Sequence, residues 1–245
     1  MHLKSLTCDA LARPVYFCAA RSAKIVDVQL VERHLHKPEE IRGRLQQMID
    51  ATEGQHYQAI ALAFGLCGQA TSGLVARSIP LVIPRAHDCI TLFLGSRQRY
   101  KNEIEKEPGT FWYSQDYLER KSDDSTALSM GATTDADLQT MYEKYIQKYG
   151  RAKADRLMAV ISEWMTHYKR AAYLDLGLGD GSAAEDEARA DAVRRNWQFE
   201  RIAANLDLFQ RLLDGKWDED FLIVQPGQRI VMSYDDNVIE SQATQ

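Results

Sequence analysis

The chain has 245 residues, of which 45% are hydrophobic, and it carries a net charge of -5 at pH 7, so it can form one large domain or two smaller ones. An acidic chain without a basic patch is not expected to bind nucleic acid. No apolar run approaches the roughly 20 residues of a membrane span, and residues 1–6 lack the apolar core of a signal peptide, so we expect a cytoplasmic protein without a membrane partner.

Strands and helices alternate through the first hundred residues. A strand over residues 3–6 is followed by a helix over 10–21, with Pro14 in its first turn. The β-branched stretch 25–31 predicts a second strand, and Pro38 with two acidic neighbours predicts the start of a helix. Apolar runs at 57–64 and 79–83 predict buried strands, and residues 90–100 predict a helix. This alternation is typical of a parallel, doubly wound α/β sheet.

The pattern changes after residue 100. Residues 101–132 are polar around an aromatic cluster at 111–113, for which we expect a connection or lid. Helical periodicity follows over 135–148 and 153–170, and strands at 171–176, 198–202 and 221–224 then alternate with helices. The polar tail from Asp235 is expected to fray. The predicted fold class is therefore α/β, with two Rossmann-like halves that hold parallel sheets, residues 1–120 and 171–245, linked by a helical segment over 121–170.

Three cysteines follow predicted strands of the first half: Cys8, Cys67 and Cys89. Ligands of open parallel sheets bind outside the carboxyl ends of the strands, so we expect these thiols to converge there, together with His36 and His87. Zinc accepts thiolate and imidazole ligands, and iron–sulfur clusters are held by thiolates. Three cysteines with His87 would complete a tetrahedral zinc site, whereas three cysteines alone would leave one position open for a substrate. Cys18 lies inside a predicted helix and outside this set.

Other interpretations of these residues stay open. One is a metal-free catalytic cysteine with His87 or His36 as its general base, and another is a set of ordinary buried thiols with surface histidines. Asp88 either orients a histidine or caps the following helix. Arg85 either holds an anionic substrate or pairs with an acidic side chain.

A glycine-rich loop follows the predicted strand at 171–176. Its sequence is similar to the motif of S-adenosylmethionine-dependent methyltransferases, in which Gly177, Gly179 and Gly181 would let a cofactor approach the backbone. The remaining chain is too short for the rest of that fold, and the acidic residues around the loop make a poor phosphate site. A tight turn is the favoured interpretation.

Seven short segments stand out together: residues 7–11, 35–38, 65–68, 80–89, 108–110, 173–177 and 221–224. They resemble an uncharacterised family, domain of unknown function 1638. The resemblance covers nearly the whole chain, and the run from Arg85 to Cys89 is its most specific part. It implies that the cysteine and histidine positions of the family correspond to Cys8, His36, Cys67, His87 and Cys89. It also implies an association with corrinoid-dependent methyl transfer. The His87-x-Cys89 pair with a distant cysteine is similar to the zinc site of thiol-activating methyltransferases.

We therefore expect a metal-dependent enzyme that carries zinc or an iron–sulfur cluster. It would perform group transfer or lyase chemistry on a small methyl- or sulfur-containing substrate, linked to corrinoid methyl transfer. The metal ligands would be Cys8, Cys67, Cys89 and His87, and the catalytic groups would be His36, His87, Asp88 and Arg85. The alternatives are a carrier that delivers a metal, cluster or corrinoid to a methyltransferase protein, and a methyltransferase that binds S-adenosylmethionine at the Gly177 loop.

Overall fold

The structure is a computed structural model that describes residues 1–32, 38–120 and 135–244. The chain folds as two compact units: unit 1 comprises residues 1–100 and 204–245, and unit 2 comprises residues 101–203. These limits differ from the boundaries at 120 and 170 drawn from the sequence. The difference arises because the C-terminal segment returns to unit 1, where one of its strands completes the sheet.

The main sheet of unit 1 consists of β1 (His2–Cys8), β2 (Ile25–Val31), β3 (Ala59–Ala63), β4 (Leu81–Pro84) and β8 (Phe221–Val224). Its strand order is β2-β1-β3-β4-β8. β1 pairs in parallel with β2 and β3, and β3 pairs in parallel with β4. β8 joins antiparallel to β4. The predicted α/β class with parallel sheets is confirmed.

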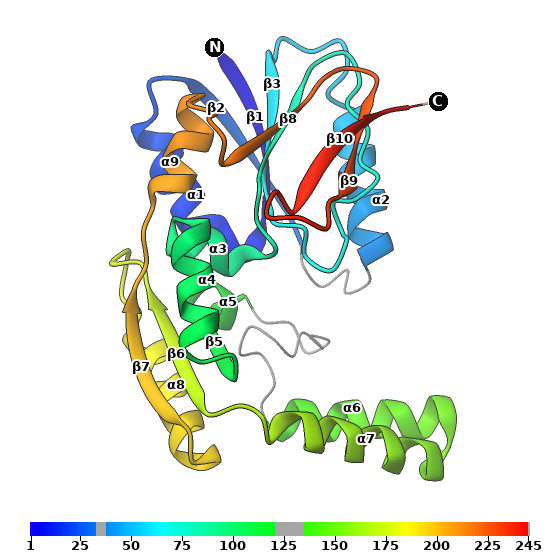
Figure 1. Ribbon diagram of the computed structural model, residues 1–245, viewed down its shortest axis with the longest axis vertical. Helices are drawn as coiled ribbons and strands as arrows, with labels where there is room; N and C mark the ends of the chain where they lie inside the picture. Colours follow the sequence, from blue (N-terminus) through cyan, green and yellow to red (C-terminus); the bar gives the residue numbers. More distant parts are fainter. Residues whose placement is uncertain (33–37, 121–134, 245) are drawn as a thin grey trace. The chain divides into compact units, whose positions relative to one another are not determined.

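Helices cover both faces of this sheet (Figure 1). A short 3-10 helix, η1 (Asp9–Leu11), leads into α1 (Ala12–Arg21), which lies with α9 (Asp207–Asp214) on one face. On the other face lie α2 (Pro38–Asp50) and the antiparallel hairpin of β9 (Gln228–Met232) and β10 (Ile239–Ala243). The predicted helix over 90–100 is interrupted at Gly95, so that α3 (Cys89–Leu94) and α4 (Arg97–Lys106) are separate. The tail predicted to fray instead forms β10.

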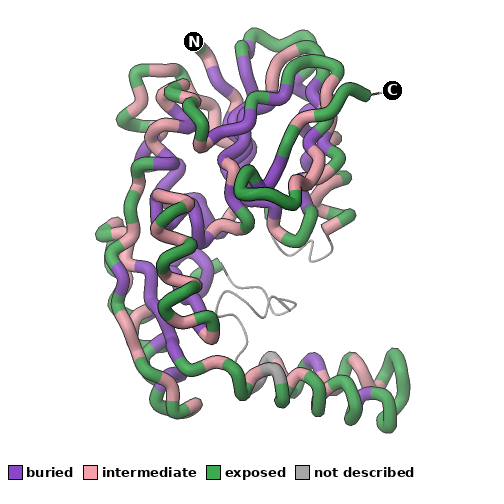
Figure 2. The backbone as a smooth tube through the Cα atoms, viewed as in Figure 1, coloured by how far each residue is buried: buried purple, intermediate pink, exposed green. Residues whose placement is uncertain are grey.

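The core of unit 1 lies where α2 and the hairpin pack on the central strands. All five residues of β3 are buried, because both faces of the sheet are covered (Figure 2). Apolar side chains from the strands and from α2 form one cluster, which includes Leu6, Ile60, Leu62, Ile83, Leu45, Ile49, Ile230 and Ile239. The central strands β1, β3 and β4, which lead to the three cysteines, therefore pack against this core.

Unit 2 is built on β5 (Thr110–Ser114), β6 (Arg170–Asp175) and β7 (Gln198–Ala203), which pair in parallel in that order. Its helices are α5 (Gln115–Glu119), α6 (Asp135–Tyr149), α7 (Arg151–Met165) and α8 (Ser182–Arg195). The aromatic stretch expected to form a connection or lid is the strand β5, and it is fully buried. Aromatic residues favour strands, and Phe111 packs against Tyr168 and Trp197. Within the described residues, every helix is too short or too polar to cross a bilayer.

Replacing Leu62 by Ala tests the importance of the central strand. Leu62 is fully buried in β3, so we expect the free energy of unfolding to fall by about 2–5 kcal/mol through lost burial and a cavity. Urea denaturation measures this value. The matched control is Ile25→Ala at the start of β2, where the side chain is 63% exposed and the expected loss is under about 1 kcal/mol. Equal losses for the two variants would contradict the assigned core.

Candidate metal centre at the carboxyl edge of the unit 1 sheet

Three cysteines lie at the carboxyl ends of neighbouring parallel strands. Cys8 is the last residue of β1, Cys67 lies in the loop after β3, and Cys89 is the first residue of α3, just after β4. These strands are adjacent in the order β1-β3-β4. The carboxyl ends of parallel strands share one edge of the sheet, which is where open α/β sheets bind ligands.

The loops that carry Cys67 and Cys89 are bonded to each other. The backbone N–H of Leu66 donates to the carbonyl of Ala86 at 2.8 Å, and that of Cys67 donates to the carbonyl of His87 at 2.9 Å. Gly65 permits this approach, because a Cβ atom there would lie 2.6 Å from the Cα atom of Asp88. These contacts fix the two cysteine loops side by side.

The backbone at Cys67 adopts an uncommon conformation. Its φ is 47°, and Gly68 and Gln69 follow with φ of 63° and 74°. A non-glycine residue in the left-handed region costs on the order of 1 kcal/mol, and such strain concentrates at functional sites. The hydrogen bond from Cys67 to His87 helps to hold the turn in place.

The three thiols influence one another electrostatically. Burial raises the pKa of Cys89 well above its usual range, and Cys67, Asp88 and Cys8 raise it further. Burial and Asp88 raise the pKa of Cys67 to about 12, although the backbone N–H groups of Gly65 and Cys89 oppose this shift. Thiols with raised pKa values are protonated at neutral pH, so Cys67 and Cys89 do not have the character of activated, metal-free nucleophiles.

The separation of the thiols bears on the kind of ligand that they fit. Among the residues that the structure describes, Cys8, Cys67 and Cys89 do not form a group whose ligand atoms all lie within 4.8 Å of one another. Three thiolates about 2.3 Å from one zinc ion would lie about 3.8 Å apart. Sulfurs that hold an iron–sulfur cluster stand further apart, because the atoms of the cluster lie between them. Zinc and an iron–sulfur cluster therefore both stay open as ligands of these thiols.

Asp88 acts as a helix cap in this structure. Its Oδ1 accepts hydrogen bonds from the backbone N–H groups of Ile90 at 3.0 Å and Thr91 at 3.4 Å, and its Oδ2 accepts one from the hydroxyl of Tyr100 at 3.2 Å. Burial raises the pKa of Asp88, while these hydrogen bonds and His87 lower it. The cap fixes the start of α3 and thereby the position of Cys89.

His87 contacts Tyr100, and Arg85 contacts the C-terminal hairpin. The His87 side chain is exposed and stacks on Tyr100, with 6.1 Å between ring centroids. Arg85 turns to the C-terminal hairpin, where it donates to the carbonyl of Ile239 and, at 3.3 Å, to that of Asn237. Arg85 therefore helps to hold the hairpin against β4.

One predicted site residue and the one cysteine outside the predicted set remain to be placed. His36 lies outside the described residues. Cys18 is buried within α1 and apart from the strand ends, and burial raises its pKa to about 11.

The glycine loop belongs to unit 2, where it follows β6. Gly177 and Gly179 have φ of 62° and 76°, and the backbone N–H of Gly177 donates to Asp175 at 3.0 Å. The carbonyl of Gly181 accepts a hydrogen bond from the hydroxyl of Tyr173 at 3.2 Å. These contacts account for the glycines as parts of a tight turn.

Sequence reasoning did not single out two residues that shape this site. Gly65 is required by the contact with Asp88, and Tyr100 bonds to Asp88 and stacks on His87. The pattern Gly65-Leu66-Cys67-Gly68 carried a signal for the first, because glycine often marks a close backbone approach. Nothing local marks Tyr100, because its contact depends on the turn between α3 and α4.

Comparison with known proteins gives one match. A family model described as "Protein of unknown function (DUF1638)" matches residues 30–213, which confirms the resemblance noted from the sequence. No curated protein and no solved structure matches. The matched residues include Cys67 and Cys89, whereas Cys8 precedes them.

Replacing Gly65 by Ala tests the contact between the two cysteine loops. The new Cβ atom would meet backbone atoms of Asp88, which can move only if the loops separate, so we expect a loss of about 1–3 kcal/mol in stability. Urea denaturation measures it. Gly43→Ala in α2 is the matched control: a Cβ there meets nothing within 4 Å, and a gain of about 0.5–1 kcal/mol is expected. A Gly65→Ala variant with the same free energy of unfolding as the wild type would show that the two loops do not touch.

The raised pKa of Cys67 predicts slow alkylation in chelator-treated protein. The thiolate is the reacting form, and at pH 8 a thiol of pKa about 12 is almost wholly protonated. We expect Cys67 to react with iodoacetamide more than tenfold slower than a cysteine peptide, and faster as the pH rises. Site-resolved mass spectrometry measures the rate at each cysteine. Rapid alkylation of Cys67 at pH 8 would favour the metal-free nucleophile.

Proposed function

The chain belongs to the family described as "Protein of unknown function (DUF1638)", and from its own residues we propose that it is a metal-dependent enzyme. Cys8, Cys67 and Cys89 are the proposed ligands of an iron–sulfur cluster or a zinc ion. The proposed reaction is group transfer or lyase chemistry on a small methyl- or sulfur-containing molecule. The observation that carries the proposal is the placement of three thiols at the ends of three adjacent parallel strands.

The chemistry of the donor set supports a metal centre. Neighbouring thiols oppose one another's ionisation, as the effect of Cys67 and Cys8 on Cys89 indicates. A bound cation removes that cost, because coordinated thiols are deprotonated.

Three protein ligands also suit catalysis. A centre held by three cysteines keeps one coordination position for water or substrate, and a soft metal favours sulfur there. Bound to a substrate, the metal would supply Lewis-acid activation of a thiol or leaving group. The chain's own part is to hold the three loops rigid, through the cap at Asp88 and the contact at Gly65.

Metal content and colour of the purified protein test the centre. We expect anaerobically prepared protein to contain bound metal, either iron and sulfide with a brown colour or one zinc ion, because thiolates hold both. Cys67→Ala and Cys89→Ala should each lower the metal content at least tenfold. Cys18→Ala is the matched control, since this buried cysteine lies within α1, and it should retain the metal. Colourless protein that contains one zinc ion would support a zinc centre in place of a cluster. Metal-free wild-type protein would overturn the proposal.

A second measurement separates the enzyme from a carrier. An open position predicts that small thiols and methylthio compounds change the absorption spectrum of the metal-loaded protein. A carrier would instead transfer its metal to a metal-free acceptor protein, and its absorption spectrum would not change when these compounds are added. The methyltransferase alternative requires binding of S-adenosylmethionine at the Gly177 loop, which titration calorimetry measures directly.

A further inference from the structure

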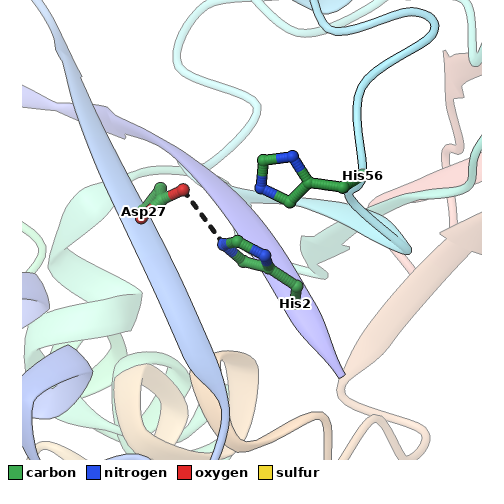
Figure 3. A group of neighbouring side chains, drawn as sticks. All are labelled: His2, Asp27 and His56. Carbon is green, nitrogen blue, oxygen red and sulfur yellow. Dashed lines mark hydrogen bonds and ion pairs between the residues drawn. The ribbon is translucent and has the colours of Figure 1, made fainter.

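A second group of metal-binding side chains lies at the opposite edge of the same sheet. His2 starts β1, Asp27 lies in β2, and His56 lies in the turn before β3 (Figure 3). One ligand atom from each of the three residues lies within 4.8 Å of the other two. β1 runs from His2 to Cys8, so about 20 Å of strand separates this group from the cysteines. The two groups are therefore distinct sites.

The sheet itself positions these residues. Asp27 pairs with Lys4, which is two residues from His2 and so lies on the same face. The backbone N–H of His2 donates to the side chain of Gln58 at 2.8 Å, and the N–H of Gln58 donates to the carbonyl of His2 at 2.9 Å. This exchange holds the turn that carries His56 beside the start of β1.

The spacing suits one ion. The Nε2 atom of His2 shares a hydrogen bond with the Oδ2 atom of Asp27 at 3.0 Å (Figure 3), and a bound ion would take the place of the proton between them. Two ligand atoms about 2.1 Å from a shared ion would stand about 3.0 Å apart at an angle of about 90° and about 3.4 Å apart at the tetrahedral angle. His56 is exposed, and its ring already lies beside that of His2, with 4.2 Å between the ring centroids.

Tyr57 supports the carboxylate. Its hydroxyl donates to Oδ2 of Asp27 at 2.7 Å, and its ring packs edge-on against His2, with 4.9 Å between centroids. Hydrogen bonds of this kind orient metal-binding carboxylates and are typical of built metal sites. Lys4 also interacts with Asp27, and its ammonium group would compete with a bound cation.

We propose that His2, Asp27 and His56 bind a divalent transition-metal ion of the zinc, cobalt and nickel class. Two imidazoles and one carboxylate suit these metals and leave coordination positions open for water or a small anion. His2 and Asp27 lie outside the residues that the family model matches, so the site is independent of the family assignment and of the proposed cysteine centre.

Titration of the chelator-treated full-length protein with Co²⁺ under anaerobic conditions tests the site. Cobalt bound by nitrogen and oxygen gives weak visible bands, whereas cobalt bound by thiolates adds an intense sulfur-to-metal charge-transfer band, so the two centres are read separately. We expect the weak bands to saturate at one equivalent. Asp27→Asn and His56→Ala should each weaken this binding at least tenfold, and Tyr57→Phe about tenfold.

Two further variants make the result decisive. His167→Ala removes an exposed histidine of unit 2 and should leave the affinity unchanged. Lys4→Met should tighten binding, because it removes the competing charge. Unchanged affinity in His56→Ala, or a spectrum with thiolate bands alone, would overturn the site. His56 is exposed, so loss of folding is not expected in this variant, and its melting temperature without metal checks that point.

Discussion

The structure of unit 1 depends on the parallel pairing of β1, β3 and β4. This pairing brings residues distant in sequence to one edge, and the contact between Gly65 and Asp88 then locks two of the three cysteine loops together. Everything proposed for the thiols follows from these two constraints. Strand pairing sets which side chains are neighbours, and the backbone contact sets how near they come.

The two edges of this sheet present different ligand chemistry. The carboxyl edge carries three thiols, which suit soft metals and clusters, and the amino edge carries two imidazoles and a carboxylate, which suit borderline ions. β1 contributes to both, with His2 at its start and Cys8 at its end. A single strand therefore ties two chemically distinct groups of side chains to one core, so damage to that core would affect both.

The sequence predicted the strands that carry the cysteines because each is a short apolar run that ends at a chemically distinctive residue. The strand β5 was not predicted, because the polar residues around this aromatic stretch favoured a connection. The sequence alone does not show which side chains bury the strand. The return of β8 to β4 was also missed, since pairing across such a separation leaves no local pattern. For the same reason His2, Asp27 and His56 gave no signal: only the fold brings them together. Arg85 was noted for its charge, but its partners are carbonyl groups of the hairpin.

The return of the C-terminal segment makes unit 2 an insertion within unit 1. During synthesis, β4 emerges from the ribosome long before β8, and until Phe221–Val224 arrives its outer edge has no strand beside it. An unpaired edge of buried, apolar residues is a template for pairing with other chains. Unit 2 can complete its own sheet first, because its residues are contiguous. The nascent chain thus carries an unpaired, apolar sheet edge for as long as unit 2 takes to emerge, and assistance from a chaperone would matter most during that interval.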